Sequence, residues 1–292
     1  AHTDRVGLVG AAVSDLPELA ALCRHGAGTG LKLSFSSLRA DALEGPLIEQ
    51  LQRSRVKTAT IAPDAGSERL RRVINKGVDE AAILKAAEAL VAGGIPNLRL
   101  YFMVGLPTET GDDIQAITDL VKAIKHRFLR SSRARGRMGD ITVSLSSFVP
   151  KPATPFQWAP MAEEKTLKAR LKKIKADLRR VANVRVHSDM PRWAFIQALL
   201  ARGDRRVADL LQAAHHNGGN WPQTFKAAVL NPQFYVYRER ERTELLPWDL
   251  IDHGVRKGYL WNEYQRALDA KPTPPCPATP EACAVCGACA GE

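Results

Sequence analysis

The chain has 292 residues, of which 45% are hydrophobic and 25% charged, a balance typical of a globular protein. No run of about 18 uninterrupted apolar residues occurs, so we expect no transmembrane helix. The net charge of +11 favours polyanionic partners such as RNA, although a generally basic surface would account for it equally well.

The first two thirds of the chain alternate between apolar, β-branched runs and stretches of helical period. The apolar runs are 6–13, 31–35, 58–62, 98–106, 141–148 and 184–187. Strands that alternate with helices predict a parallel sheet with right-handed crossovers. Because the runs are nearly continuous in apolar residues, we expect strands that are buried on both faces.

Two helical stretches, 112–127 and 163–182, show the clearest period, with apolar residues recurring at intervals of three and four. Thr110, followed three residues later by Asp113, predicts a capping-box-like start for the first helix. The second helix has a basic face that includes Arg170, and we interpret this face as solvated. The basic segment 126–140 is predicted to be a loop.

Polar and glycine-containing motifs follow several predicted strands, at 14–15, 36–41, 63–67, 105–110 and 146–150. A site built from many strand ends is typical of a barrel, which favours a barrel over a doubly wound sheet. We therefore predict an α/β fold with an open, TIM-type parallel barrel over residues 1–190. A small helical C-terminal extension over 191–270 and a Cys-rich tail over 271–292 are predicted to follow.

Three of these strand-end motifs could form a binding site. In the first, Asp64 to Gly66 forms a tight turn and Ser67 caps a helix, so that backbone N–H groups and one carboxylate could grip a ribose or an amino-acid group. An ordinary strand–helix turn would use similar residues. In the second, Gly105 permits close backbone approach and Glu109 follows it. The third, 144–158, is proline-rich and is predicted to be extended.

The order of these motifs resembles the radical S-adenosylmethionine (SAM) superfamily, and within it the B12-binding-domain-containing radical SAM proteins. The resemblance covers nearly the whole chain. The segments that carry it are SLRAD (37–41), APDAGSERLRRVINKG (62–77), LRLYFMVGLPTET (98–110), SSFVPKPATPFQW (146–158) and IQALLARGDRRV (196–207).

The resemblance implies that SAM lies across the carboxyl ends of the strands and chelates a [4Fe–4S] cluster. Reductive cleavage of SAM would then give a 5′-deoxyadenosyl radical. The residues at the matching positions are Ser14 and Asp15 for the SAM amino group, Ser37, Arg39 and Asp41 for its carboxylate, Asp64 and Ser67 for the ribose, and Gly105, Glu109, Ser147 and Phe148 for the adenine. The family usually has Glu where this chain has Asp64, and the shorter side chain weakens that assignment.

The cluster motif of the superfamily, C-x-x-x-C-x-x-C after the first strand, occurs nowhere in these 292 residues. Cys23 cannot hold a cluster alone, and we expect it to be a buried apolar residue. By the resemblance, the run 6–13 would be the second barrel strand. The cluster ligands, and any cobalamin-binding domain, would then lie upstream, and this chain would be an inactive fragment without them. An electron donor such as flavodoxin or ferredoxin is the implied partner.

Four cysteines, Cys276, Cys283, Cys286 and Cys289, crowd into the end of the chain. Their spacing predicts zinc or a second iron–sulfur cluster in a reducing, cytoplasmic compartment, and a disordered reactive tail is the alternative. For the whole protein, the leading hypothesis is a radical SAM enzyme of unknown substrate. An RNA-modifying, methylthiotransferase-like enzyme and a non-catalytic metal-binding module are the alternatives.

Overall fold

The structure, a computed structural model, describes residues 3–9, 13, 16–35, 38–43, 45–133, 139–276, 283 and 285–288. The chain folds into two compact units. The first, which we call the strand unit, comprises Ala1–Val104, Glu109–Ser146 and Arg170–Ser188. The second, which we call the helical unit, comprises Gly105–Thr108, Ser147–Ala169 and Asp189–Glu292.

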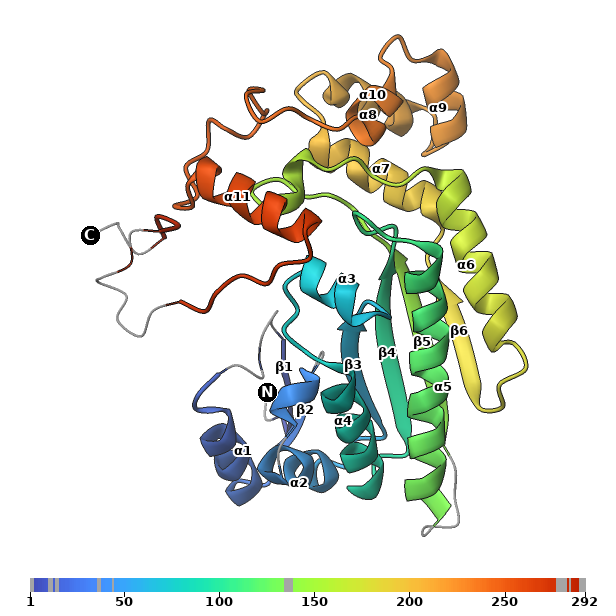
Figure 1. Ribbon diagram of the computed structural model, residues 1–292, viewed down its shortest axis with the longest axis vertical. Helices are drawn as coiled ribbons and strands as arrows, with labels where there is room; N and C mark the ends of the chain where they lie inside the picture. Colours follow the sequence, from blue (N-terminus) through green and yellow to red (C-terminus); the bar gives the residue numbers. More distant parts are fainter. Residues whose placement is uncertain are drawn as a thin grey trace. The chain divides into compact units, whose positions relative to one another are not determined.

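Parallel strands are the basis of the strand unit (Figure 1). They are β1 (Arg5–Leu8), β2 (Lys32–Phe35), β3 (Thr58–Asp64), β4 (Asn97–Val104), β5 (Ile141–Ser147) and β6 (Val184–Ser188). The first two pair in parallel, and the other four form a sheet in the order β3-β4-β5-β6. A parallel bridge joins Leu38, beyond the end of β2, to Ile61 of β3. Each predicted run overlaps one of these strands, so the parallel α/β pattern is confirmed, whereas closure into a barrel stays a prediction.

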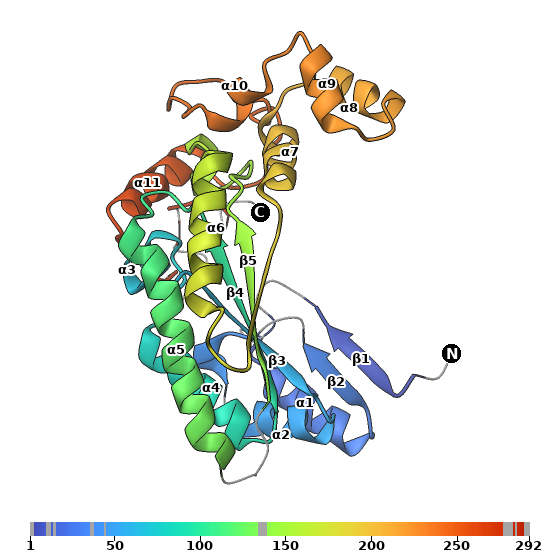
Figure 2. The ribbon, with the colours of Figure 1, turned by 90° about the vertical axis from the view of Figure 1, so that its right-hand side faces the viewer.

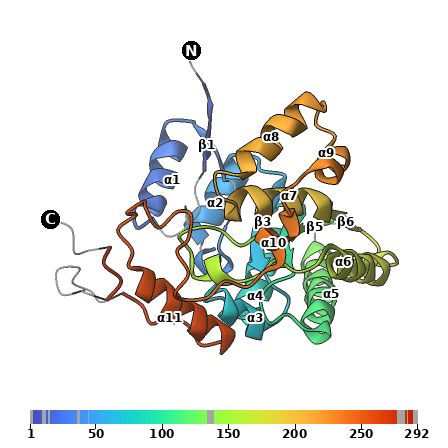
Figure 3. The same cartoon turned by 90° about the horizontal axis from the view of Figure 1, so that it is seen from above.

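Helices connect the strands. In chain order they are α1 (Leu19–Gly28), the short η2 (Ala40–Ala42), α2 (Gly45–Arg53), α3 (Glu68–Val73), α4 (Glu80–Ala92), α5 (Gly111–Arg133) and α6 (Glu164–Leu178). Helices α4 and α5 pack together on one face of β3 and β4 (Figure 2). Helices α1 and α2 pack against each other and against β2, and the view from above shows α1 beside β1 (Figure 3). No helix among the described residues is long and apolar enough to cross a membrane.

Helix α5 begins and packs as its sequence predicts. The Thr110 backbone N–H and hydroxyl both donate to Asp113 Oδ2, at 2.8 Å each, which confirms the predicted cap. The apolar side of the helix is buried, from Ile114 to Phe128. The prediction of a loop over 126–140 is wrong for residues 126–133, because the helix continues through Arg133. Residues 134–138 lie outside the described part of the chain.

Strand β4 separates a buried face from an open one. Leu98, Leu100 and Phe102 are at most 1% exposed, whereas Arg99 and Tyr101 between them are exposed. Side chains alternate across a strand, so the buried set is the one that faces α4 and α5. The expectation of burial on both faces is therefore wrong for β4. Strands β3 and β5 show the same alternation between buried and less buried residues.

The helical unit lacks a described sheet and is built from short helices. These are η3 (Pro155–Trp158), α7 (Pro191–Arg202), α8 (Val207–His216), α9 (Trp221–Ala227), α10 (Pro232–Tyr237) and α11 (Lys257–Leu268). Trp158 and Tyr264 stack at 6.1 Å, and Trp261 contacts the edge of the Trp158 ring at 5.1 Å. This aromatic cluster joins η3 to α11 and forms one core of the unit.

Candidate functional site

The turn after β3 has a constrained backbone. Asp64 has a φ of 62°, a conformation that Asp and Asn adopt more readily than most residues, and the pairing register shifts between Ile61 and Asp64. A Cβ on Gly66 would lie 2.2 Å from the backbone nitrogen of Ile117, so only glycine lets the turn approach α5 this closely. The Ser67 hydroxyl accepts from the backbone N–H of Leu70 and caps α3, as predicted.

Arg71 holds the turn after β3 in place through hydrogen bonds to backbone carbonyls. Its side chain is 1% exposed, and its guanidinium donates to the carbonyls of Ala65 at 3.1 Å, Gly66 at 2.9 Å and Val78 at 2.9 Å. Burial lowers the pKa of this guanidinium, and the negative charge of Glu68 opposes the shift. The sequence contains no signal that separates Arg71 from its exposed neighbour Arg72, so this residue was not predicted.

Asp113 connects the turn after β3 to the start of α5. It accepts from Ser67 Oγ at 2.5 Å, from Arg69, and from both donors of Thr110. Burial alone would raise the pKa of this carboxyl, but the hydrogen bonds from Arg69, Ser67 and Thr110 outweigh it and hold the pKa below its usual value. The Ser67 hydroxyl, predicted to serve a ribose, therefore already donates within the protein.

Charged residues of alternating sign gather near the ends of β2 and β3. Arg39 binds Asp41 through two hydrogen bonds of 3.1 and 2.7 Å, and Lys76 pairs with Asp64 at 2.6 Å. The hydrogen bond from Arg39 holds the pKa of Asp41 below its usual value, and the charge of Lys76 adds to this effect. Three predicted residues, Arg39, Asp41 and Asp64, thus lie around one lysine that was not predicted. Their side chains are all partly exposed, so a small polar ligand can reach them.

Glu109 is held by an arginine from α6. Its side chain is 1% exposed, and Arg170 donates to its carboxylate at 2.7 Å and to its backbone carbonyl at 3.1 Å. The interpretation of Arg170 as part of a solvated face is therefore wrong. Periodicity placed this residue on the basic side of α6, but the pair with Glu109 cannot be read from periodicity. The buried ion pair fixes the segment that follows β4.

Three predicted adenine-side residues belong to the helical unit. Gly105 has a φ of 92°, and a Cβ there would meet the Leu167 side chain at 2.6 Å, so the turn requires glycine. The Ser147 hydroxyl is buried and has no hydrogen-bond partner among the described residues. Phe148 is buried and contacts Phe156 edge to face at 5.5 Å. Ser147 therefore keeps a hydroxyl for a ligand, whereas Phe148 is largely used in packing.

Four predicted site residues, Ser14, Asp15, Ser37 and Cys289, lie outside the described residues. Among the cysteines that the structure describes, Cys276 is exposed, and Cys283 and Cys286 are half-buried. The backbone carbonyl of Cys286 accepts from Arg256 N–H at 2.8 Å, which docks this part of the tail at the start of α11.

The tail cysteines influence a nearby tyrosine. Burial raises the pKa of the Tyr259 hydroxyl, and the charges of Glu263, Cys286 and Cys276 raise it further. Of these two cysteines, Cys286 lies at the start of α11, where its carbonyl accepts from Arg256. Within the described ranges, no three His, Cys, Asp or Glu side chains converge as a metal site, so the predicted metal centre stays a prediction. Cys23 is 2% exposed in α1, which agrees with its predicted packing role.

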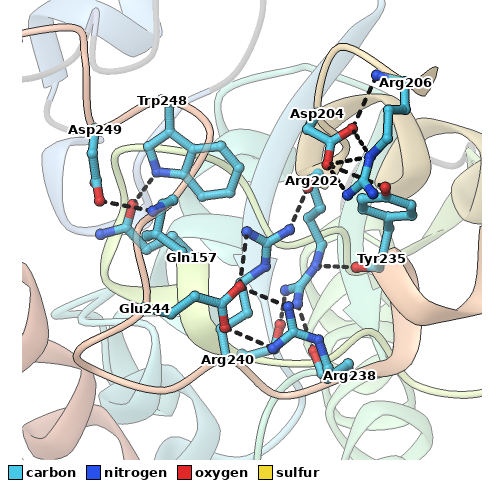
Figure 4. A network of polar contacts seen from close by, with 12 residues as sticks. Gln157, Arg202, Asp204, Arg206, Tyr235, Arg238, Arg240, Glu244, Trp248 and Asp249 are labelled. Atoms are coloured by element: carbon cyan, nitrogen blue, oxygen red, sulfur yellow. Dashed lines mark hydrogen bonds and ion pairs between the residues drawn. The ribbon is translucent and has the colours of Figure 1, made fainter. Parts of the chain in front are cut away.

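The motif 196–207 contains the central residue of a polar network in the helical unit (Figure 4). Arg202 is fully buried and donates to the carbonyls of Tyr235 at 2.8 Å, Arg238 at 2.6 Å and Ala159. Burial, with the nearby charges of Arg240 and Arg238, lowers the pKa of Arg202 to about 10. The motif was predicted to matter only through the resemblance, and the structure gives it a role in packing.

The open face of the four-stranded sheet carries polar side chains. Thr60 of β3 is in register with Arg99 of β4, and Ser144 of β5 is in register with His187 of β6. Arg99 and His187 are exposed. Residues in register on neighbouring strands point to the same face. The face therefore offers hydroxyls, a guanidinium and an imidazole to a ligand.

Comparison with known protein families identifies the class of domain to which the N-terminal part of the chain corresponds. Residues 3–121, which include β1 to β4 and the charged residues near the ends of β2 and β3, match the family model described as "Radical SAM superfamily". This region is therefore a radical SAM superfamily domain, as the motifs indicated.

A particular relative is an uncharacterized protein of Methanocaldococcus jannaschii, 35% identical over 210 residues. The alignment covers 71% of this chain and 43% of that protein, so the chain spans less than half of the relative's length. The relative's name states no substrate. The narrower resemblance to B12-binding radical SAM proteins gains no support from either comparison.

Proposed function

We propose that this chain supplies the SAM-binding strand ends of a radical SAM enzyme. The observation that carries the proposal is the match of residues 3–121 to the superfamily, together with the charged residues at the ends of β2 and β3. When bound, SAM and a reduced [4Fe–4S] cluster would supply a 5′-deoxyadenosyl radical. An open, partial barrel is the arrangement in which the strand ends would serve this role.

The side chains of the strand unit fit the polar groups of SAM. SAM carries a carboxylate, an ammonium group and a ribose diol, and Arg39, Asp41 and Asp64 offer one cation and two carboxylates within the reach of Lys76. In this proposal Arg39 binds the carboxylate of the ligand, and Asp64 accepts from a ribose hydroxyl. Each would exchange its present intramolecular partner for the ligand, and Lys76 would lose or share Asp64.

The cysteines of this chain do not fit a [4Fe–4S] cluster that binds SAM. The C-x-x-x-C-x-x-C spacing is missing from the sequence, and the described residues contain no convergent group of three ligands. A cluster needs three or four thiolates held close together. We therefore propose that its ligands come from sequence beyond these 292 residues. The role of this chain is then to bind and orient SAM.

The direct test is to measure SAM binding to the 292-residue chain by equilibrium dialysis with radiolabelled SAM. Arg39→Gln and Asp64→Asn should each weaken binding about tenfold, since hydrogen bonds to charged groups contribute roughly 1.5–3 kcal/mol. Asp119→Asn is the matched control, because Asp119 is an exposed carboxylate on α5 that accepts from Gln115 at 3.1 Å, away from the strand ends. Equal binding by all four proteins would reject the assigned residues.

The second test is SAM cleavage. Protein made from its complete coding sequence, purified anaerobically with iron and reduced with dithionite, should release 5′-deoxyadenosine from SAM. The 292-residue chain alone should release none. Product from the chain alone would contradict the placement of the cluster ligands, and no product from the complete protein would contradict the proposed chemistry.

The C-terminal cysteines are proposed as a separate metal site. Support comes from the repeated two-residue spacing and from the docking of Cys286 at the start of α11. Metal analysis of anaerobically purified protein should give one equivalent of zinc, or iron with sulfide, and Cys283→Ser with Cys286→Ser should abolish it. Freely titrating thiols without bound metal would reject the site.

A further inference from the structure

A groove in the helical unit is lined mainly by aromatic side chains. It has a volume of about 660 Å³ and lies among the start of α6, helix α7, and the starts of α9 and α10. Its aromatic residues are Trp193, Phe195, Trp221, Phe225 and Tyr237. They come from three helices separated in sequence by polar and glycine-containing turns. The fold therefore collects aromatic rings that do not form a motif along the chain.

The rings form a wall with exposed faces. Phe195 contacts Phe225 edge to face at 5.7 Å and Tyr237 at 5.5 Å, and Trp221 contacts Phe225 at 5.4 Å. These contacts hold the wall together. Trp193 is 47% exposed and stacks on no other ring within the described part of the chain, so much of its indole surface is open. A flat aromatic ligand can stack there without displacing the packed rings.

The polar groups of the groove limit the ligand further. The Arg192 guanidinium lies over one face of the Trp193 ring, 5.3 Å from its centre, so a positive charge stands next to the indole. Glu164, Asn220 and Gln233 add a carboxylate and two amides. Glu164 pairs with Lys168 at 2.6 Å, which compensates its charge at the edge of the groove. A matching ligand has a flat ring, a negative group beside it and hydrogen-bonding edges or hydroxyls.

We infer that this groove binds single-stranded RNA, with a base stacked on Trp193 and a phosphate near Arg192. Stacking on aromatic side chains and cationic contact with the backbone are the two components of single-strand binding. A duplex does not fit this mode, because its bases are already stacked on each other. The Glu164 carboxylate can accept from a ribose 2′-hydroxyl, which DNA lacks. The net charge of +11 favours a polyanion over a cationic ligand.

The test uses a fluorescently labelled, 12-nucleotide single-stranded RNA of mixed sequence. The RNA is titrated with the 292-residue chain, and binding is measured as the increase in fluorescence anisotropy. Trp193→Ala should weaken binding at least about fivefold, because stacking of one base contributes about that much or more. Trp193→Phe should restore most of the affinity. Arg192→Gln should weaken binding and make its dependence on salt less steep.

Matched controls separate the groove from the general basic surface. Phe234→Ala removes a similarly exposed aromatic ring (48%) that does not line the groove, and Arg205→Gln removes an exposed charge outside it. Both should bind RNA like the wild type. Thermal melting monitored by circular dichroism checks that each variant is folded.

Three results would overturn the inference. The first is an equal loss of affinity in the groove variants and the control variants. The second is equal affinity for single-stranded DNA and RNA of the same sequence. The third is competition for the groove by tetramethylammonium at low millimolar concentration, without competition by mononucleotides. The last would identify the groove as a cage for an ammonium group. None of these measurements uses SAM, so they fail or succeed independently of the radical chemistry.

Discussion

The two units solve the problem of buried backbone groups differently. In the strand unit, parallel strands and long helices pair most of their own N–H and C=O groups, and apolar side chains fill the space between them. In the helical unit, short helices leave carbonyls at their ends, and the buried guanidinium of Arg202 binds three carbonyls from two separate segments, the end of α10 and the residue after η3. Regular structure stabilises the first unit, and a polar network stabilises the second.

The difference shows where a buried charge is useful in a fold. Arg240 donates to the Arg202 carbonyl, and Arg238 forms two bonds of 2.6 Å with Glu244, so the arginines of the network are linked to each other and to one carboxylate (Figure 4). A fixed fork of donors can bind several carbonyls at once, which an apolar side chain cannot do. Loops and short helices can then pack without a sheet.

The largest expected effect comes from removing the centre of that network. Arg202→Met should lower the free energy of unfolding by about 3–5 kcal/mol, because three carbonyls lose a charged donor in a buried place. Urea unfolding monitored by tryptophan fluorescence measures it. Arg202→Lys should recover little, since one ammonium group cannot reach all three carbonyls. The control Arg205→Met changes an exposed arginine and should cost less than about 0.5 kcal/mol. A cost for Arg202→Met that matches this control would remove the contrast between the units.

In the strand unit, one position sensitive to substitution is a glycine that has no room for a side chain. Gly66→Ala should cost about 2–4 kcal/mol, because the new methyl group would overlap the backbone of α5 at Ile117. Gly111→Ala is the matched control: the added methyl group meets no atom within 4 Å, so stability should be unchanged or slightly higher. Thermal unfolding of the two variants gives the comparison. Equal melting temperatures would show that the turn relaxes away from α5.

A smaller effect is expected where the strand unit does use a polar centre. Asp113→Asn should cost about 1–3 kcal/mol, since the amide cannot accept all the bonds from Ser67, Arg69 and Thr110. Asp112→Asn, exposed in the same first turn of α5, should cost only a few tenths of a kcal/mol. Chemical denaturation distinguishes the two. Similar costs would show that the bonds to Asp113 contribute little beyond the helix dipole.

The smallest effect depends on pH. Hydrogen bonding to Arg206 lowers the pKa of Asp204 from 3.8 to about 2, although partial burial opposes it. A depressed carboxyl pKa stabilises the fold above the unfolded value and loses that contribution as pH falls through the folded value. Asp204→Asn should therefore cost less than about 1 kcal/mol at pH 6, since the pair is near the surface, and progressively less as the pH falls toward 2. A double-mutant cycle with Arg206→Gln over pH 2–6 measures it, and a coupling independent of pH would contradict it.

The strands and the long helices could be predicted because their patterns are local. Apolar runs located β1 to β6, and intervals of three and four located α5 and α6. The burial of only one face of β4 was missed because Tyr101 extends the apolar run, although the charged Arg99 between two leucines indicates the alternation. The helix over 126–133 was missed because its residues are mostly polar, and helix α5 propagates into them from an apolar, packed start.

The candidate site was predictable in part for the same reason. Glycine at 66 and 105 and serine at 67 have local backbone roles, so their types indicate turns and caps. Arg71 and Arg202 escaped prediction because their partners are carbonyls, which every residue has. The aromatic groove escaped because its rings are up to 44 positions apart in sequence, from Trp193 to Tyr237.

The two faces of β4 have a consequence for how such a protein can change. Leu98 and Leu100 are constrained by packing, whereas Arg99 and Tyr101 contact solvent on the opposite side of the same strand. Substitutions at positions 99 and 101 can therefore change the chemistry of the exposed face at little cost in folding free energy. Over evolution, this segment is therefore expected to retain Leu98 and Leu100 and to vary at residues 99 and 101. A library randomised at 99 and 101 should consist mostly of folded members, whereas one randomised at 98 and 100 should not.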